Sequence, residues 1–509
     1  MKRMKLWMIP LAAALFAACS SSDSDDPAPQ PNPTPTPNPN PSVESSYTAL
    51  PTGAGAYRDA CLTLEFKSAA PSLGTSGKIR IYTAAGKQVD EIDLKDVAAE
   101  RTQLVNTSLY TTAMDAIGSR KLGAYRIVNY DPVRIEGRRV TIKPHYAVLD
   151  YNASYYVTVD KEAIVAEAFD GIAASEWTFT TKAAPSGTSV TVGERGADFR
   201  TVQAALDYAY DCGRDAAVTV TVKNGIYEEQ LFMRYNNNVT LRGESRTGTV
   251  IRYDNCEALA TGVGSSVSSL PALGQPIQKS GGRGVMLVEN CDLLRIENLT
   301  LENTHGSGSQ AEALYFNDNT GTGRLVFVGC DILSAQDTFN LKGYCWFCDC
   351  LVAGDVDFIW GGVDTALFEK CEIRSVNGGY IVQARCAAGK RGFVFIDCSL
   401  TKAAGANSKE VYLARTGGTA TSDNVTYVNC RMGTHVAAAG WLAPMSPAAA
   451  DAVNGWKEYG STDAAGASLD LSKRLAGSYR LTQAEYEAGF RDRATVFAAC
   501  SKGTEWLRE

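Results

Sequence analysis

A cysteine recurs after a short alternating apolar run throughout the C-terminal half of the chain, and this repeat restricts the fold more than any other feature. The repeating cysteines are Cys291, Cys330, Cys350, Cys371, Cys398 and Cys430. Their successive spacings are 39, 20, 21, 27 and 32 residues, which indicates one constant unit with loops of differing length. Short β-rich units without a helical pattern between them predict a parallel β-helix, in which each coil stacks on the last.

The stacking of coils gives the cysteines a structural explanation. Equivalent positions form rows, and cysteine is small and behaves as a buried hydrophobic residue, so we expect an interior ladder. Disulfides among these cysteines are the alternative. Cys345, Cys348 and Cys350 also raise the question of zinc, but the sequence offers neither a second ligand pair nor a nearby histidine. We therefore predict no metal and no cofactor.

The chain divides into four segments. Residues 187–509 are the predicted right-handed, single-stranded parallel β-helix, and the amphipathic stretch 197–209 is expected to cap its open first coil. Residues 46–184 contain short runs with period-two alternation, such as Leu62–Phe66 and Tyr155–Val159, which predict an all-β sandwich. This segment resembles bacterial Ig-like domains, and we expect it to be structural.

The first 45 residues have the pattern of a targeting segment. Three basic residues precede the 13-residue apolar stretch Leu6–Ala18, which is too short to span a bilayer. Residues 1–18 are therefore a predicted signal peptide, and Cys19 stands where a lipoprotein is lipidated. An ordinary cleaved signal peptide with a chance cysteine is the alternative. The acidic run Ser20–Asp26 resembles the export tag of Bacteroidetes lipoproteins.

Residues 19–45 continue as an acidic and then proline-rich linker, which would act as a semi-rigid spacer. These features predict an outer-membrane lipoprotein exposed at the cell surface, with the periplasmic face as the alternative orientation. The lipid would be its only membrane contact.

Charge and histidine content exclude several classes of function. The formal net charge is -7 and the pI is about 5.3, so no basic face for nucleic acid is expected. The chain has three histidines and no Gly-x-Ser-x-Gly elbow, which disfavours a Ser-His hydrolase. A fully ionised polyanion would be repelled, whereas an esterified acidic polysaccharide remains a suitable partner.

Two aspartates share the 20-residue spacing of the repeat. Asp337 and Asp357 each lie seven residues after a ladder cysteine, so they should occupy equivalent positions on neighbouring strands, roughly 4.8 Å apart. Two carboxyl groups at that separation resist ionising together, so the pKa of one should rise while the other stays low. Such a split supplies an acid and a nucleophile. Two ordinary loop aspartates, or a calcium ligand, are the alternatives.

Several short motifs resemble those of pectin methylesterases, and they occur in the family's order across residues 187–509. Gln336–Phe339 and Gly354–Gly361 resemble the two central signatures of that family. The other matching stretches are Asp198–Ala205, Gly225–Glu229, Gln310–Leu314, Tyr380–Arg385, Gly440–Trp441 and Trp456–Tyr459. Each stretch is short, but the ordered set is specific.

The resemblance implies a covalent route to hydrolysis of methyl esters of galacturonate units in pectin (homogalacturonan). Asp357 would attack the ester carbonyl, and Asp337 would protonate the departing methanol and then activate water. Gln310 and Gln336 would donate to the oxyanion. Arg415 would hold Asp357 ionised and oriented.

The resemblance also implies a substrate cleft, with one departure. Trp360 and Trp441 would offer apolar faces to sugar rings, and Gln383 would add a polar contact. The family's Leu-Gly-Arg-Pro-Trp stretch reads Leu413–Gly417 here, so Gly417 replaces a tryptophan that usually contacts the sugar. This change leaves the reaction type intact but affects the choice of substrate. The insert Ala258–Gly284 is a candidate for a different wall.

Other functions remain open at this stage. A polysaccharide hydrolase or lyase shares the β-helix, and an esterase or thioesterase could use the same residues on a non-pectin ester. A non-catalytic polysaccharide-binding helix is disfavoured by the complete set of two aspartates, two glutamines and an arginine. We expect the protein to act as a monomer.

Overall fold

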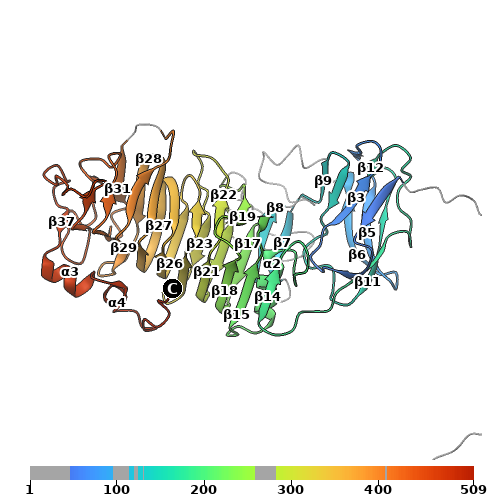
Figure 1. Cartoon of the computed structure of the whole chain (residues 1–509), viewed down its shortest axis with the longest axis horizontal. Coiled ribbons are helices and arrows are strands. Elements are labelled where there is room, and N and C mark those ends of the chain that lie inside the picture. The colour runs from blue at the N-terminus through green and yellow to red at the C-terminus, as the bar shows by residue number, and fades with distance from the viewer. Residues whose placement is uncertain (1–45, 96–113, 120–123, 130, 258–281, 407–409) are drawn as a thin grey trace, which may run out of the picture. The chain divides into compact units, whose positions relative to one another are not determined.

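The computed structural model describes residues 46–95, 114–119, 124–129, 131–257, 282–406 and 410–509, and it is built almost entirely of strands (Figure 1). The predicted signal peptide 1–18, Cys19 and the linker 19–45 lie outside the described residues. Between residues 46 and 257 and from 282 onward, no described helix is long and apolar enough to cross a membrane.

Nine of the described N-terminal strands form two sheets that share one core, as the alternating runs predict, and the other four form two separate pairs. One sheet has the order β1-β3-β10-β9 and the other β2-β13-β11-β5-β6. Leu64 and Val140 from the first sheet pack with Ile81 and Val157 from the second around the buried Trp177. The strands of this part are β1 (Tyr47–Leu50), β2 (Gly53–Ala56), β3 (Leu62–Phe66), β4 (Ser72–Leu73), β5 (Lys78–Thr83), β6 (Gln88–Asp93), β7 (Met114–Ser119), β8 (Ala124–Asn129), β9 (Val133–Glu136), β10 (Arg139–Ile142), β11 (Ser154–Val159), β12 (Ile164–Val165) and β13 (Thr178–Thr181).

The remaining strands form the predicted parallel β-helix. Most pair in parallel with the strand one coil away, as β15 does with β18 and β18 with β21. The strands are β14 (Ser189–Val192), β15 (Val218–Val222), β16 (Gly225–Glu228), β17 (Leu231–Arg234), β18 (Asn237–Gly243), β19 (Thr249–Tyr253), β20 (Met286–Glu289), β21 (Asp292–Glu297), β22 (Thr300–Asn303), β23 (Leu314–Asn317), β24 (Arg324–Val328), β25 (Asp331–Leu333), β26 (Phe339–Cys348), β27 (Leu351–Glu369), β28 (Glu372–Ala384), β29 (Gly392–Ile396), β30 (Ser399–Lys402), β31 (Val411–Thr416), β32 (Val425–Val428), β33 (Arg431–Met432), β34 (Trp441–Leu442), β35 (Trp456–Tyr459), β36 (Thr462–Asp463) and β37 (Tyr479–Arg480).

Three helices accompany the coils in the described part of the chain. Helix α2 (Val202–Asp211) is the predicted cap, and its Val202, Leu206 and Ala209 pack into the core against the first strands. Its N-cap Thr201 accepts the Ala204 N–H, which satisfies a donor that the first helical turn leaves free. The short helices α3 (Gln483–Gly489) and α4 (Arg493–Val496) follow the last coil, and Phe497 after α4 packs on an outer row of apolar side chains.

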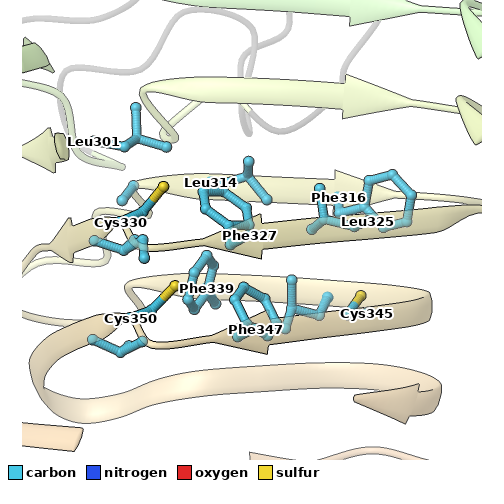
Figure 2. Close-up of a cluster of buried hydrophobic side chains, with 14 of the residues drawn as sticks. Leu301, Leu314, Phe316, Leu325, Phe327, Cys330, Phe339, Cys345, Phe347 and Cys350 are labelled. Carbon is cyan, nitrogen blue, oxygen red and sulfur yellow. The ribbon is translucent and has the colours of Figure 1, made fainter. Parts of the chain in front are cut away.

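The interior of the helix consists of rows of equivalent side chains, which confirms the predicted cysteine ladder. Cys330 lies in line with Cys350, and Phe327 with Phe347 (Figure 2). All six ladder cysteines are buried free thiols. An aromatic row runs beside them, and the Phe347 and Phe368 rings stack with centroids 4.4 Å apart.

A left-handed residue precedes every ladder cysteine and explains the regularity of the repeat. The six residues have φ between 49° and 63°. They are Asn290, Gly329, Asp349, Lys370, Asp397 and Asn429. Glycine, asparagine and aspartate adopt this conformation more readily than other residues, so each coil turns its corner at the same place.

Candidate active site

Asp337 and Asp357 lie at equivalent positions of consecutive coils. Leu333 pairs with Ala353 before them and Phe339 pairs with Ile359 after them, so the register on both sides is 20 residues. Both aspartates are almost fully buried, with 3% and 5% of their surface exposed. Both have positive φ, 64° and 48°, which is uncommon outside glycine and is retained where the surroundings enforce it. The register therefore brings the two carboxyl groups together.

Asp357 is held by an arginine and a glutamine. Arg415 on β31 donates from Nε to Asp357 Oδ1 at 2.7 Å and from Nη2 to Oδ2. Gln383 on β28 donates from Nε2 to Oδ2 at 3.1 Å. A two-pronged arginine contact stabilises an ionised carboxylate and also fixes its orientation. The hydrogen bonds to Asp357 raise the pKa of Arg415 in turn.

The surroundings of Asp337 favour its protonated form. Burial raises the pKa of Asp337 to about 8, and the negative charges of Glu312 and Asp357 add to that rise. Arg283 and Arg385 oppose the shift without reversing it. At neutral pH Asp337 is therefore a neutral acid beside the arginine-bound Asp357, and acid and nucleophilic chemistry requires two such different environments.

Gln310 and Gln336 lie on consecutive coils beside the acid. Their backbones form a parallel bridge, and Asp337 directly follows Gln336. Both side chains are half-buried. Arg283 donates from Nη1 to Gln310 Oε1, which leaves the Gln310 amide nitrogen available as a donor. The arrangement can therefore present amide N–H groups to an oxygen that gains negative charge.

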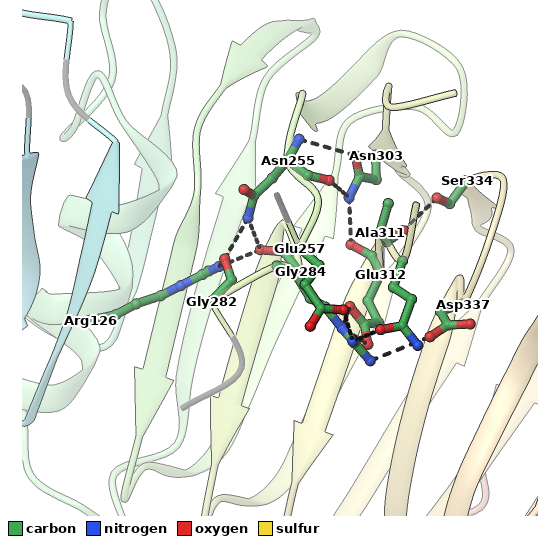
Figure 3. Close-up of polar contacts among 12 residues, drawn as sticks. Arg126, Asn255, Glu257, Gly282, Gly284, Asn303, Ala311, Glu312, Ser334 and Asp337 are labelled. Atoms are coloured by element: carbon green, nitrogen blue, oxygen red, sulfur yellow. Dashed lines mark hydrogen bonds and ion pairs between the residues drawn. The ribbon is translucent and has the colours of Figure 1, made fainter. Parts of the chain in front are cut away.

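Arg283 and Glu312 are functional candidates that sequence reasoning did not identify. Arg283 Nε lies 2.8 and 2.9 Å from the two carboxylate oxygens of Glu312, and its Nη2 lies 3.3 Å from Asp337 Oδ2. Figure 3 shows Glu312 and Asp337 converging on this guanidinium, together with the more exposed Glu257. The available signal was an acidic residue inside the small apolar run Ala311–Leu314, because a buried charge requires a partner.

Trp360 lies on the outer surface of β27, near the aspartates. Its ring is half-buried, with the guanidinium of Arg385 4.8 Å and that of Arg283 5.7 Å from the ring centroid. The position is compatible with the predicted sugar-contacting role.

Two predicted substrate contacts are corrected by the structure. Trp441 is 1% exposed and stacks on Trp456 in the core, with centroids 5.4 Å apart. It pairs with the inward-facing Ala414, so its side chain points inside and has no face to offer a sugar. Gln383 is also buried, and both ends of its amide are engaged, by Asp357 and Arg385. It therefore orients Asp357 instead of contacting substrate.

The glycine at the family's tryptophan position is a structural requirement in this chain. A Cβ at Gly417 would lie 2.0 Å from the backbone oxygen of Ala384 and 2.7 Å from Cγ of Arg385. Arg385 thus occupies the space beside Gly417 and reaches over Trp360. The greater part of the insert Ala258–Gly284 lies outside the described residues, and so does any wall that it forms.

Metal binding was not predicted, and the described ranges contain no cluster of three or more His, Cys, Asp or Glu side chains placed to hold an ion. Cys345, Cys348 and Cys350 are all buried thiols in the interior or on the apolar outer row.

Comparisons with known proteins agree with this architecture. The family model described as Pectinesterase matches residues 189–491. A probable pectinesterase A of Aspergillus niger is 34% identical over 236 residues, which are 46% of this chain and 66% of that protein. A probable pectinesterase A of Neosartorya fischeri is 31% identical over 295 residues, covering 57% and 82% of the two chains.

A crystal structure of the pectin methylesterase from Aspergillus niger superposes with a TM-score of 0.50 at 24% identity. The match covers 64% of this chain and 98% of that one, and it shows the shared fold. Since the family model spans more than half of the sequence and the β-helix is the part that it matches, the chain belongs to the pectinesterase family.

Proposed function

We propose that this protein hydrolyses the methyl esters of galacturonate units in pectin and releases methanol without cutting the polymer. The observation that carries the proposal is that the two stacked aspartates have different chemical surroundings. Arg415 and Gln383 clamp Asp357 as a carboxylate, whereas burial keeps Asp337 protonated. Family membership and the names of the relatives supply the substrate class.

In the first half-reaction a carboxylate oxygen of Asp357 attacks the ester carbonyl carbon. The electron pair of the carbonyl moves to its oxygen, and the side-chain N–H groups of Gln310 and Gln336 stabilise that oxyanion. Each such donor contributes about 2.7–4 kcal/mol to transition-state stabilisation. When the intermediate collapses, the bond to the methoxy oxygen breaks and Asp337 gives it a proton. Methanol leaves, and the acyl group remains on Asp357 as an anhydride.

In the second half-reaction Asp337 is a carboxylate and acts as the base. It takes a proton from water as the water oxygen attacks the acyl carbon, and the bond to the Asp357 oxygen breaks. The products are free galacturonic acid, which releases its proton to solvent, and the Asp357 carboxylate. Asp337 ends the cycle protonated, as it began.

The stacking of the two aspartates also argues against an inverting glycosidase. An inverting hydrolase needs carboxyl groups roughly 6.5–9.5 Å apart, with a water between them. Asp337 and Asp357 lie on adjacent coils, where strands are about 4.8 Å apart, and the charge of Asp357 raises the pKa of Asp337. An ester other than methyl pectate is the second candidate, because Gly417 and Arg385 replace the family's tryptophan wall.

The test is to measure methanol, reducing ends and unsaturated products together on methylated pectin. Methanol alone is expected; new reducing ends would favour a hydrolase, and unsaturated products a lyase. Asp357→Asn should abolish turnover at nearly constant shape. Asp364→Asn is the matched control, because Asp364 lies on the same strand but pairs with Lys390. Turnover that persists in Asp357→Asn would refute the nucleophile assignment.

We further infer that the enzyme is an outer-membrane lipoprotein anchored through Cys19, that it is exposed at the cell surface, and that it acts as a monomer. The basic, apolar and acidic pattern of residues 1–26 supports the anchor. Labelling with palmitate should mark the wild-type chain but not Cys19→Ala, and protease treatment of intact cells should degrade a surface-exposed chain. If the wild-type protein is not labelled, the lipid anchor is refuted and residues 1–18 are an ordinary cleaved signal peptide.

We also infer that the β-helix is right-handed, because parallel strands connected within one sheet almost always are. The two-sheet N-terminal sandwich supports the inference of an Ig-like domain with a structural role.

A further inference from the structure

Each active-site aspartate contacts an arginine, but only one of these arginines also binds a buried glutamate. Among the described residues, Arg415 forms its ion pair with Asp357 alone. Arg283 pairs with Asp337, with Glu312 and with Glu257. The Glu312 side chain is 1% exposed, whereas that of Glu257 is 49% exposed. The positive charge of Arg283 is therefore offset by a buried glutamate, whereas that of Arg415 is not.

Glu312 explains how Asp337 can lie beside an arginine and still be protonated. An uncompensated arginine beside a carboxyl group favours the ionised form of that group. Asp337 must instead hold a proton while it accepts a hydrogen bond from Arg283. Glu312 binds Arg283 Nε through both carboxylate oxygens, so a buried negative charge offsets the guanidinium next to the acid.

The same guanidinium also sets the orientation of a glutamine. Arg283 carries only donors, so its contact with Gln310 identifies the bonded atom as the amide oxygen. The amide nitrogen then points away from Arg283. The backbone that carries Arg283 is held in place, because the buried Asn255 donates to the carbonyl oxygens of Gly282 at 2.5 Å and Gly284 at 3.4 Å (Figure 3).

We propose that Arg283 and Glu312 form a charge-neutral pair of positioning residues, which orients the Gln310 amide toward the oxyanion and lets Asp337 contact a cation while it remains a protonated acid. The proposal rests on the ester hydrolysis proposed above and deepens it. It also assigns the proton of Asp337 to Oδ1, since Oδ2 accepts from Arg283.

Several charged groups among the described residues lie close to Asp337. Glu312 and Asp357 raise its pKa, and Arg283 and Arg385 lower it. Arg415 lies close enough for Asp337 to raise its pKa in return. Of the charges, Glu312 acts most strongly on Asp337, so it is the one to remove.

The test is the pH profile of kcat/KM for Glu312→Gln. Its basic limb should move to lower pH by about one to two units, because one nearby charge shifts a carboxyl pKa by that amount. Activity lost at neutral pH should therefore return on acidification, with KM little changed. Glu257→Gln is the matched control: it removes the same charge from the same arginine, but at an exposed position, and should leave the limb in place.

Two variants of Arg283 separate positioning from charge and cover the possibility that Glu312→Gln folds poorly. Arg283→Lys keeps the positive charge but loses the forked guanidinium that holds Gln310. Its kcat should fall by up to about 10²–10³-fold, which is the effect of losing one oxyanion donor, while the basic limb of the pH profile should stay in place. The double variant Glu312→Gln/Arg283→Met removes both charges, and its limb should return toward that of the wild type while kcat stays low.

A measurement without turnover keeps this proposal distinct from the ester hydrolysis itself. Infrared titration, with Asp337→Asn as the reference, should show a protonated Asp337 carboxyl at neutral pH in the wild type and its loss at lower pH in Glu312→Gln. A wild type that releases no methanol would refute the proposed function, yet this titration would still test the pair. An identical titration in wild type, Glu312→Gln and Glu257→Gln would overturn the proposal.

Discussion

Replacing Asp337 by asparagine should make folding stability depend less on pH. The folded state raises the pKa of this carboxyl from 3.8 to about 8, chiefly through burial. The folded chain therefore holds the proton more tightly than the unfolded chain does. The resulting stabilisation is fully present below pH 3.8 and is lost as pH rises through about 8.

The size of the effect follows from the difference in pKa. One unit corresponds to about 1.4 kcal/mol, so the wild type should lose about 4 kcal/mol of unfolding free energy between pH 4 and pH 7 through this group alone. Asp337→Asn keeps nearly the same shape but has no proton to lose. Its stability relative to the wild type should rise by about that amount over the same interval and level off above pH 8.

Denaturant unfolding of both proteins at a series of pH values measures this difference. Asp451→Asn is a useful control, because N–H groups of Asn454 and Val453 lower the pKa of the exposed Asp451. That group stabilises the fold at higher pH, so its removal should give a small trend of opposite sign. A flat difference for Asp337→Asn would show an ionised Asp337 at neutral pH, and an ionised group has no proton to give to methanol.

Three further outcomes are expected. Trp441→Ala should lower the unfolding free energy by about 3–5 kcal/mol and leave KM unchanged, because Trp441 is buried. Trp360→Ala should raise KM with a smaller loss of stability. Denaturant unfolding and steady-state kinetics of both variants measure these two effects. Gly361→Ala should destabilise by at least about 1–3 kcal/mol, because a Cβ at φ 131° would lie 2.1 Å from the Leu341 oxygen. Circular dichroism melting should show a smaller loss for Gly389→Ala, which shares the strain of a positive φ (80°) but has open space around its Cβ. The kcat/KM profile of the wild type should fall as pH rises through about 8, where the acid Asp337 is lost; a profile flat to pH 9 would contradict its role.

The repeat made much of the fold predictable from sequence. The cysteine spacing marks residues that recur once per coil, and the left-handed residue before each cysteine turns every coil at the same point. The same 20-residue offset carried Asp337 onto Asp357, and the structure places both in that register. These relations are predictable because stacking converts a regular spacing along the chain into neighbourhood in space.

The direction in which individual side chains point was harder to predict from the sequence. Trp441 looked like a surface aromatic because of its motif, yet its pairing with Ala414 turns it into the core. A shift of one residue in a strand reverses which face a side chain occupies, and motif resemblance does not resolve that shift. Gln383 was similarly assigned to substrate, although its amide spans Asp357 and Arg385.

The sequence by itself determined the β-helix and the pairing of the aspartates, because both follow a short repeat, whereas their glutamine and arginine partners were predicted from the family resemblance. The family resemblance named Asp337 as the acid, but only the tertiary structure gave the physical reason for that role. The reason is burial together with the charge of Glu312, which also binds Arg283, and Arg283 lies 54 residues before Asp337 and outside the repeat. Desolvation and charge pairing act through space, so their balance is decided only when distant segments of the chain are brought together.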